Sequence, residues 1–480
     1  MKRHIIYISG LLAVLLSFTA CEDFLNQQPR LSQTNELSLA TFNGLQSATL
    51  GSYTPLYNTN WYGRDLVITS DLRGGNAMIS PISSGRFVTE YLWNNNPGAT
   101  STLWATAYEL IARVNNVINK IEGGFEEAGV EQSELNRLDA ECKFLRALAY
   151  HDLARVFCQP YTKVNGRDNL GVPVMLVTEI GTPARNTLGE VYDQIVNDLL
   201  DAIEGLPEVS PNGGTDPAGW ATSYAAKALL SRVYLYMGDW QNAADYATEV
   251  IDEFPGALYS AGEYATWVDG GSWGTDNGNE VIFEVFGAEG NSTHGNWEVI
   301  SYIMSPLGYG DIGASYDVYN LMEDGDVRKG MFVNSVKWPT NIWSTKYPGK
   351  APDGNLREDN IPVLRLSEMY LNRAEAIQNG ATVSGVTALD DINTIRTIRN
   401  ATPYTEVDLP LIYKERRIEL CFEGQESFDL ARTGRSLERT DYNGAVNRNI
   451  AFPDYRWAMA IPQAEMDANP NMEQNPGYSE

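Results

Sequence analysis

Residues 221–253 predict two helices joined by a short turn. Apolar residues recur at helical spacing on both sides of Gly238-Asp239-Trp240. Small residues line the faces that would meet: Ala225, Ala228, Ala243, Ala244 and Ala247. A helix pair of this kind cannot bury its apolar face alone, so it must stack on further helices. The segment therefore favours a helical scaffold over a sheet or barrel.

Other segments carry the same helical periodicity. They are 103–121, 134–157, 187–205, 363–380 and 386–400. Thr187 and Glu190 form a capping box at the start of the third of these. The small-residue turn at Gly238 resembles that of a tetratricopeptide repeat. We expect the scaffold mainly in residues 40–253 and 361–400.

Residues 254–360 have a different character. They are rich in Gly, Asn, Asp, Trp and Tyr, and only a short strand at Val281–Phe286 stands out. The aromatic residues favour an ordered insertion over a flexible linker. The predicted fold class is mainly α, with an irregular, loop-rich ligand-binding region, about 254–360 and 401–480, packed on helical repeats.

The N-terminus predicts export and lipidation. Lys2 and Arg3 precede an apolar run from Ile5 to Ala20, which is short for a membrane span and fits a signal peptide over residues 1–20. Small residues then lead into Cys21, the expected site of lipid attachment. The remaining chain, 21–480, is expected to form one domain.

Composition excludes several classes of protein. Asp and Glu number 62 against 35 Lys and Arg, a balance that repels nucleic acid. Cys142, Cys158 and Cys421 form no C-x-x-C pair, and three His residues are too few for a His-rich zinc site. No metal or cofactor is expected.

Catalytic motifs appear only as weak matches. Gly270–Gly274 fits G-x-S-x-G without the strand and helix that a nucleophile elbow needs. Gly308–Gly313 fits G-x-G-x-x-G without a β-α-β rhythm around it. Asp324-Gly325-Asp326 lacks the spaced ligands of a calcium loop. We expect no catalytic residue.

Four segments in order resemble the SusD/RagB family of outer-membrane nutrient-binding lipoproteins. They are Cys21–Pro29, Ala140–Tyr150, Ile361–Ala376 continued by Glu415–Gly424 and Phe428–Leu430, and Ile461–Tyr478. Together they extend from residue 21 to residue 478, which is essentially the whole mature chain.

The resemblance implies a fold and a partner. Family members carry about four tetratricopeptide-like helix pairs. They cap a TonB-dependent SusC-like transporter in the outer membrane at the cell surface and pass it glycans or peptides. The stretch Phe24 to Pro29 and one broad face are expected to contact the transporter. The charged cluster Arg416, Arg417, Glu419 and Glu423 is expected to form ion pairs that set the fold.

The resemblance also implies a ligand site. Sugar rings bind aromatic faces beside hydrogen-bonding side chains. Trp93 and Asn96 match the aromatic-x-x-Asn spacing of some glycan-binding members, and Tyr309 matches an aromatic residue of the irregular region. Trp297, Trp273 and Arg73 are further candidates.

Other functions stay open from the sequence. A RagB-like member would hold a peptide in an enclosed cavity, and an enzyme would need a carboxylate pair or a triad in a cleft. A generic tetratricopeptide adaptor would instead bind a partner chain on its concave face.

Overall fold

The computed structural model describes residues 35–213, 217–268, 280–287, 297–349, 356 and 358–478. Cys21, the stretch Phe24 to Pro29, and Trp273 with the Gly270–Gly274 motif lie outside these residues.

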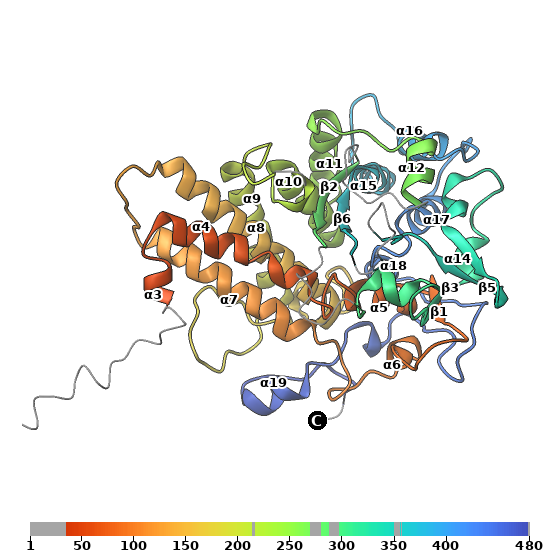
Figure 1. The fold of residues 1–480 in the computed structure, drawn as a ribbon, viewed down its shortest axis with the longest axis horizontal. Helices are drawn as coiled ribbons and strands as arrows, with labels where there is room; N and C mark the ends of the chain where they lie inside the picture. Colours follow the sequence, from red (N-terminus) through yellow and green to blue (C-terminus); the bar gives the residue numbers. More distant parts are fainter. Residues whose placement is uncertain are drawn as a thin grey trace, which may run out of the picture.

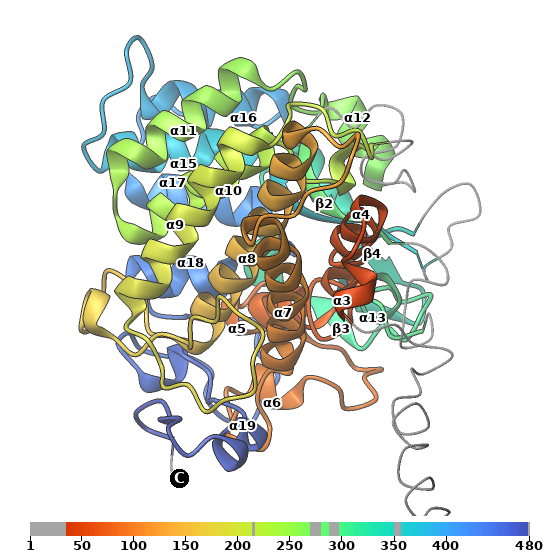
Figure 2. The ribbon, with the colours of Figure 1, turned by 90° about the vertical axis from the view of Figure 1, so that its left-hand side faces the viewer.

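A mainly helical scaffold with tetratricopeptide-like pairs runs through the molecule (Figures 1 and 2). Each of its first helices packs on the next. They are α4 Phe42–Gly51, α7 Leu103–Glu122, α8 Gln132–Phe157, α9 Leu188–Gly205, α10 Ser223–Met237 and α11 Trp240–Glu253. The predicted helices and the turn at Gly238 are confirmed, and Thr187 with Glu190 forms the predicted capping box.

The scaffold continues after the insertion. Helix α11 packs directly on α15, although residues 254–365 separate them in sequence. Helix α15 in turn contacts α16 and α17. The bounds are α15 Leu366–Gln378, α16 Ala388–Ile398 and α17 Leu409–Leu420.

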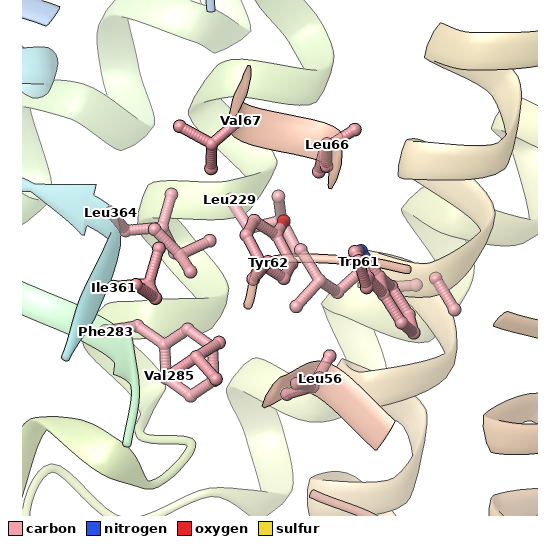
Figure 3. Packing of buried hydrophobic residues seen from close by; sticks show 14 of the residues in the cluster. Leu56, Trp61, Tyr62, Leu66, Val67, Leu229, Phe283, Val285, Ile361 and Leu364 are labelled. Atoms are coloured by element: carbon pink, nitrogen blue, oxygen red, sulfur yellow. The ribbon is translucent and has the colours of Figure 1, made fainter. Parts of the chain in front are cut away.

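The predicted start of a helix at residue 363 is wrong. Residues Ile361–Arg365 form β6, which pairs antiparallel with β2, Val281–Val285, the predicted strand. Both strands are fully buried and consist largely of residues that favour strands. Figure 3 shows their side chains packed on Tyr62 and Leu229, beside Leu66 and Val67.

The remaining elements are short and lie mostly at one side of the scaffold. A second sheet has the strand order β1-β3-β5-β4, from Ala77–Ile79, Ile312–Ala314, Trp338–Ser344 and Phe332–Ser335. The other helices are α3 Asn35–Ser38, α5 Asp65–Gly74, α6 Val88–Tyr91, α12 Ala261–Val268, α13 Ile300–Met304, α14 Tyr316–Tyr319, α18 Glu426–Thr433 and α19 Gln463–Ala468. The 3-10 turns are η1 Thr54–Tyr57, η2 Gly166–Asp168, η3 Pro217–Gly219, η4 Val327–Met331 and η5 Tyr455–Trp457.

The prediction that residues 401–480 are irregular is wrong for α17 and α18. Helix α17 packs on α15, and α18 packs on α5. The inward face of α17 carries Glu415, Arg416 and Glu419, and all three side chains are buried and form ion pairs. These charges alternate with Ile412, Ile418 and Leu420 on the buried side of α17 and obscure the apolar stripe in its sequence.

A buried network of charges joins these elements. Arg365, at the end of β6, contacts Glu280 at 2.5 Å and Glu419 at 3.1 Å. Arg399 and Arg328 reach the same Glu419 at 2.8 and 3.0 Å. Burial opposes ionisation of Glu419, but the three guanidinium groups hold its pKa well below the usual value.

The predicted structural role of the charged cluster on α17 is confirmed. Arg416 contacts Asp429 at 2.7 Å, and Glu423 contacts Arg365 at 2.7 Å, all four side chains being buried. Arg417 is half-buried and donates to the Asn76 side chain and the Gly75 carbonyl. These contacts tie α17 to β6, α18 and the end of α5.

Candidate functional site

Three aromatic side chains meet around α13, of which Trp297 and Tyr309 are exposed and Tyr302 is half-buried. The Tyr302 ring lies 5.0 Å from the Trp297 ring and 4.9 Å from the Tyr309 ring, both edge-to-face. Trp297 is 50% exposed and Tyr309 is 40% exposed. Two of the predicted ligand-binding residues are thus brought together through a third aromatic residue. We call Trp297, Tyr302 and Tyr309 the aromatic surface.

Local backbone geometry fixes this surface. Ile300, Ile303 and Met304 bury one side of α13, which leaves Tyr302 on the outer side. The backbone N–H of Tyr309 donates to the Tyr302 carbonyl at 2.9 Å and closes the turn. A Cβ on Gly308 would lie 2.3 Å from the same carbonyl oxygen, so only glycine fits there.

Charged side chains border the aromatic surface. The Arg86 guanidinium carbon lies 4.7 Å from the centre of the Tyr309 ring. Arg86 also contacts Glu298 at 2.6 Å and Asp311 at 2.9 Å. Arg64 reaches the other oxygen of Glu298 at 2.6 Å. Hydrogen-bond donors and acceptors therefore stand at the edge of an exposed aromatic face.

Trp93 and Arg73 form a separate, buried cluster. Trp93 is 1% exposed and Arg73 is 4% exposed. The Arg73 guanidinium carbon lies 3.6 Å from the Trp93 ring centre, and Trp457 contacts the same ring edge-to-face at 4.7 Å. The expectation that Trp93 and Arg73 offer exposed contacts to a ligand is wrong in this structure, because Trp457 and the surrounding chain cover them.

Asn96 is exposed, but its side chain is already engaged. Its carbonyl oxygen accepts from the Gly98 N–H at 3.0 Å within a tight turn. Among the described residues, no hydrogen bond, ion pair or ring contact links Trp93 or Asn96 directly to Tyr309. The predicted site residues thus divide between the aromatic surface and the region of Trp93.

The sequence interpretation missed Tyr302 and Arg86. Tyr302 lies seven residues before Tyr309, a spacing without meaning until the turn at Gly308 is known. Arg86 meets Glu298 and Asp311 across more than 200 residues of sequence. No local pattern in the sequence signals such contacts.

The weak motifs have structural explanations where the structure describes them. Gly308–Gly313 leads into strand β3 and opens no helix, so it lacks the context of a dinucleotide loop. Asp326 caps η4 and pairs with Arg328, and Asp324 pairs with Lys329. The described residues contain no cluster of three or more His, Cys, Asp or Glu residues suited to a metal ion. Within the same ranges, no helix is both long and apolar enough to cross a membrane.

Comparison with known proteins identifies relatives along the whole chain. Residues 23–235 match a family model described as "Starch-binding associating with outer membrane", and residues 313–478 match the SusD family model. A SusD-like protein of Bacteroides ovatus is 26% identical over 91% of this chain and 83% of its own. The starch-binding protein SusD of Bacteroides thetaiotaomicron is 34% identical over 25% of this chain and 22% of its own.

A solved structure agrees in both fold and sequence. A SusD superfamily protein from Bacteroides thetaiotaomicron superposes with a TM-score of 0.80 and is 31% identical, covering 91% of this chain and all of its own. This likeness extends over the scaffold and the insertion alike. The chain therefore belongs to the SusD/RagB family.

Proposed function

We propose that this protein is a glycan-binding lipoprotein of the cell surface, which captures oligosaccharides and delivers them to a SusC-like TonB-dependent transporter. The observation that carries the proposal is the aromatic surface of Trp297, Tyr302 and Tyr309 beside Arg86. The starch-binding description of the matching family model supports a glycan as the ligand.

The chemistry of the surface suits a sugar ring. The apolar C–H face of a pyranose stacks on an aromatic ring, while its hydroxyl groups seek charged or amide partners at the rim. Arg86 supplies N–H donors, and the partly exposed Glu298 supplies acceptor oxygens. The edge-to-face contacts hold the Tyr302 ring between its neighbours, so little side-chain entropy is lost on binding.

The proposal assigns no catalytic residue. A glycosidase needs two carboxyl groups on either side of the scissile bond, one of them able to donate a proton. The two carboxylates beside the aromatic surface, Glu298 and Asp311, are both held by Arg86. Both carboxylates are thus engaged in ion pairs, and the proposal gives neither of them a catalytic role.

The proposed lipid anchor and the proposed delivery of glycans to a transporter both rest on the sequence. Lipid on Cys21 would attach the protein to the outer membrane, each buried methylene contributing roughly 0.8 kcal/mol. Cys21→Ala should leave the precursor uncleaved or release soluble protein. Copurification from native membranes should yield a transporter barrel, and its loss on deletion of residues 24–29 would identify the contact. Recovery without any barrel would count against delivery.

Binding is tested by calorimetry with neutral and charged oligosaccharides and a peptide mixture. Trp297→Ala and Tyr309→Ala should each weaken glycan binding about tenfold, on the scale of aromatic stacking at ~1–3 kcal/mol. Tyr309→Phe is the matched control, because it keeps the ring. Binding of peptides alone would favour the RagB-like alternative, and unchanged affinity in both alanine variants would reject this site.

A further inference from the structure

A hollow lies away from the aromatic surface. It has a volume of about 420 Å³ and is formed by residues 159–170 and by the C-terminal segment 453–476. The volume falls within the range of small-molecule sites in proteins. The C-terminal segment lies at the lower left in Figure 2, whereas α13 lies at the right. We call this hollow the Tyr455 groove.

Tyr455 supplies an aromatic platform. Its side chain is 43% exposed and lines the groove. Gly477 presses against the ring, since a Cβ there would lie 2.3 Å from the Tyr455 Cγ atom. Gly477 also has a φ of +91°, a conformation that favours glycine. Tyr478 contacts the ring edge-to-face at 5.0 Å. The ring is therefore held from one side while it remains exposed to the groove.

Polar groups stand around this platform. Asn165 and Asp168 are exposed, and their side chains make no hydrogen bond within the described ranges. The Gln159 Nε2 atom donates to the Tyr455 carbonyl at 3.0 Å, which leaves its buried Oε1 atom without a partner in the described chain. Val164 and Pro453 add apolar area to the wall.

We infer that the Tyr455 groove is a second binding site, for a neutral sugar unit. An aromatic platform with amide and carboxylate partners at its rim matches a pyranose ring. Asp168 and Asp454 line the groove, Asp454 being paired with Arg456 at 2.8 Å, and the chain carries a net charge of −27. This field disfavours sulfated or uronic sugars. The site shares no residue with the aromatic surface, so it does not rest on the function proposed there.

The test counts binding sites on the full-length protein. Calorimetry with maltoheptaose and with laminarin heptasaccharide should give roughly two sites per protein, and roughly one in Tyr455→Ala. Tyr455→Phe keeps the ring and should keep both sites. Tyr309→Ala should retain the groove, and the double variant Tyr309→Ala/Tyr455→Ala should lose binding at least tenfold at each site.

Two outcomes would overturn the inference. The first is that Tyr455→Ala leaves the stoichiometry and the affinity for both probes unchanged, whether it is introduced into the wild type or into Tyr309→Ala. Circular dichroism must show in both cases that the variant is folded. The second is that a sulfated galactan oligosaccharide binds the groove as tightly as the neutral probes. Loss of binding in Tyr455→Ala but not in Tyr309→Ala would support the groove while rejecting the aromatic surface.

Discussion

Arg73 lies over Trp93, and Arg86 lies over Tyr309, but the two pairs occupy opposite environments. The first is covered by Trp457 and stabilises the interior. The second is open to solvent on one side and leaves an aromatic face free. An arginine beside an aromatic ring thus has a structural or a recognition role according to burial, not according to residue type.

Arginine–carboxylate pairs show the same contrast. Glu419 is fully buried among Arg328, Arg365 and Arg399. Glu298 is half-exposed between Arg64 and Arg86. Breaking a buried pair leaves a charge without compensation, whereas water replaces a partner at the surface. Substitutions in the buried network should therefore mainly lower stability, whereas substitutions near Glu298 should change stability little.

The largest effect is expected from Glu419→Gln. It leaves three buried arginines short of one negative charge, so the free energy of unfolding should fall by about 3–5 kcal/mol. Denaturant titration of the purified protein measures the change. A loss below about 1 kcal/mol would mean that the network is not a structural centre.

The next largest effect is expected from Trp93→Ala. The cavity that it creates should lower the free energy of unfolding by about 3 kcal/mol. Glycan affinity, measured at a temperature where the variant is folded, should stay at the wild-type value. Tyr309→Ala should show the reverse behaviour, with weak binding and nearly unchanged stability. An affinity loss in Trp93→Ala equal to that of Tyr309→Ala would return Trp93 to the ligand site.

The buried carboxyl group of Glu426 should make the stability of the protein depend on pH. Burial raises its pKa from 4.5 to about 7, with nearby charges on Arg417, Arg435, Asp429 and Asp71 adding smaller effects. The native state therefore binds more protons than the unfolded state between these values, and stability falls as pH rises through that range. Glu426→Gln should gain roughly 3 kcal/mol at pH 8 and little at pH 4. If the stability difference between Glu426→Gln and wild type were the same at pH 4 and pH 8, the raised pKa of Glu426 would be refuted.

The smallest effect is expected from Glu298→Gln. Its arginine partners stay hydrated, so the free energy of unfolding should change by less than about 1 kcal/mol. Glu298→Gln makes at the surface the same chemical change that Glu419→Gln makes in the interior, so the two single variants can be compared directly. Equal losses in the two variants would remove the distinction between surface and interior drawn above.

Periodicity predicted most of the scaffold correctly, because its helices bury apolar stripes. It failed for α17, whose buried face mixes paired charges with the apolar residues Ile412, Ile418 and Leu420. It also extended α15 too early, since the apolar residues of β6 fit a helix or a strand equally well.

The candidate site was only partly predictable for a different reason. The family resemblance pointed to Trp93 and Tyr309 alike, but a resemblance in sequence carries no information on burial. Arg86 joins the aromatic surface only through contacts made across the whole fold. An aromatic residue in a sequence can thus be proposed as a platform, while its exposure depends on the tertiary structure.

The direct packing of α11 on α15 has a consequence for evolution and engineering. Because the scaffold closes across residues 254–365, the exposed loops of that insertion, outside β2, β6 and the buried charges, can change in length with small cost to the helices beneath. Libraries that randomise Trp297, Tyr302, Leu307 and Tyr309 should yield folded proteins with altered glycan preference, provided that the buried residues of α13, Gly308, β2, β6 and the arginine network stay intact.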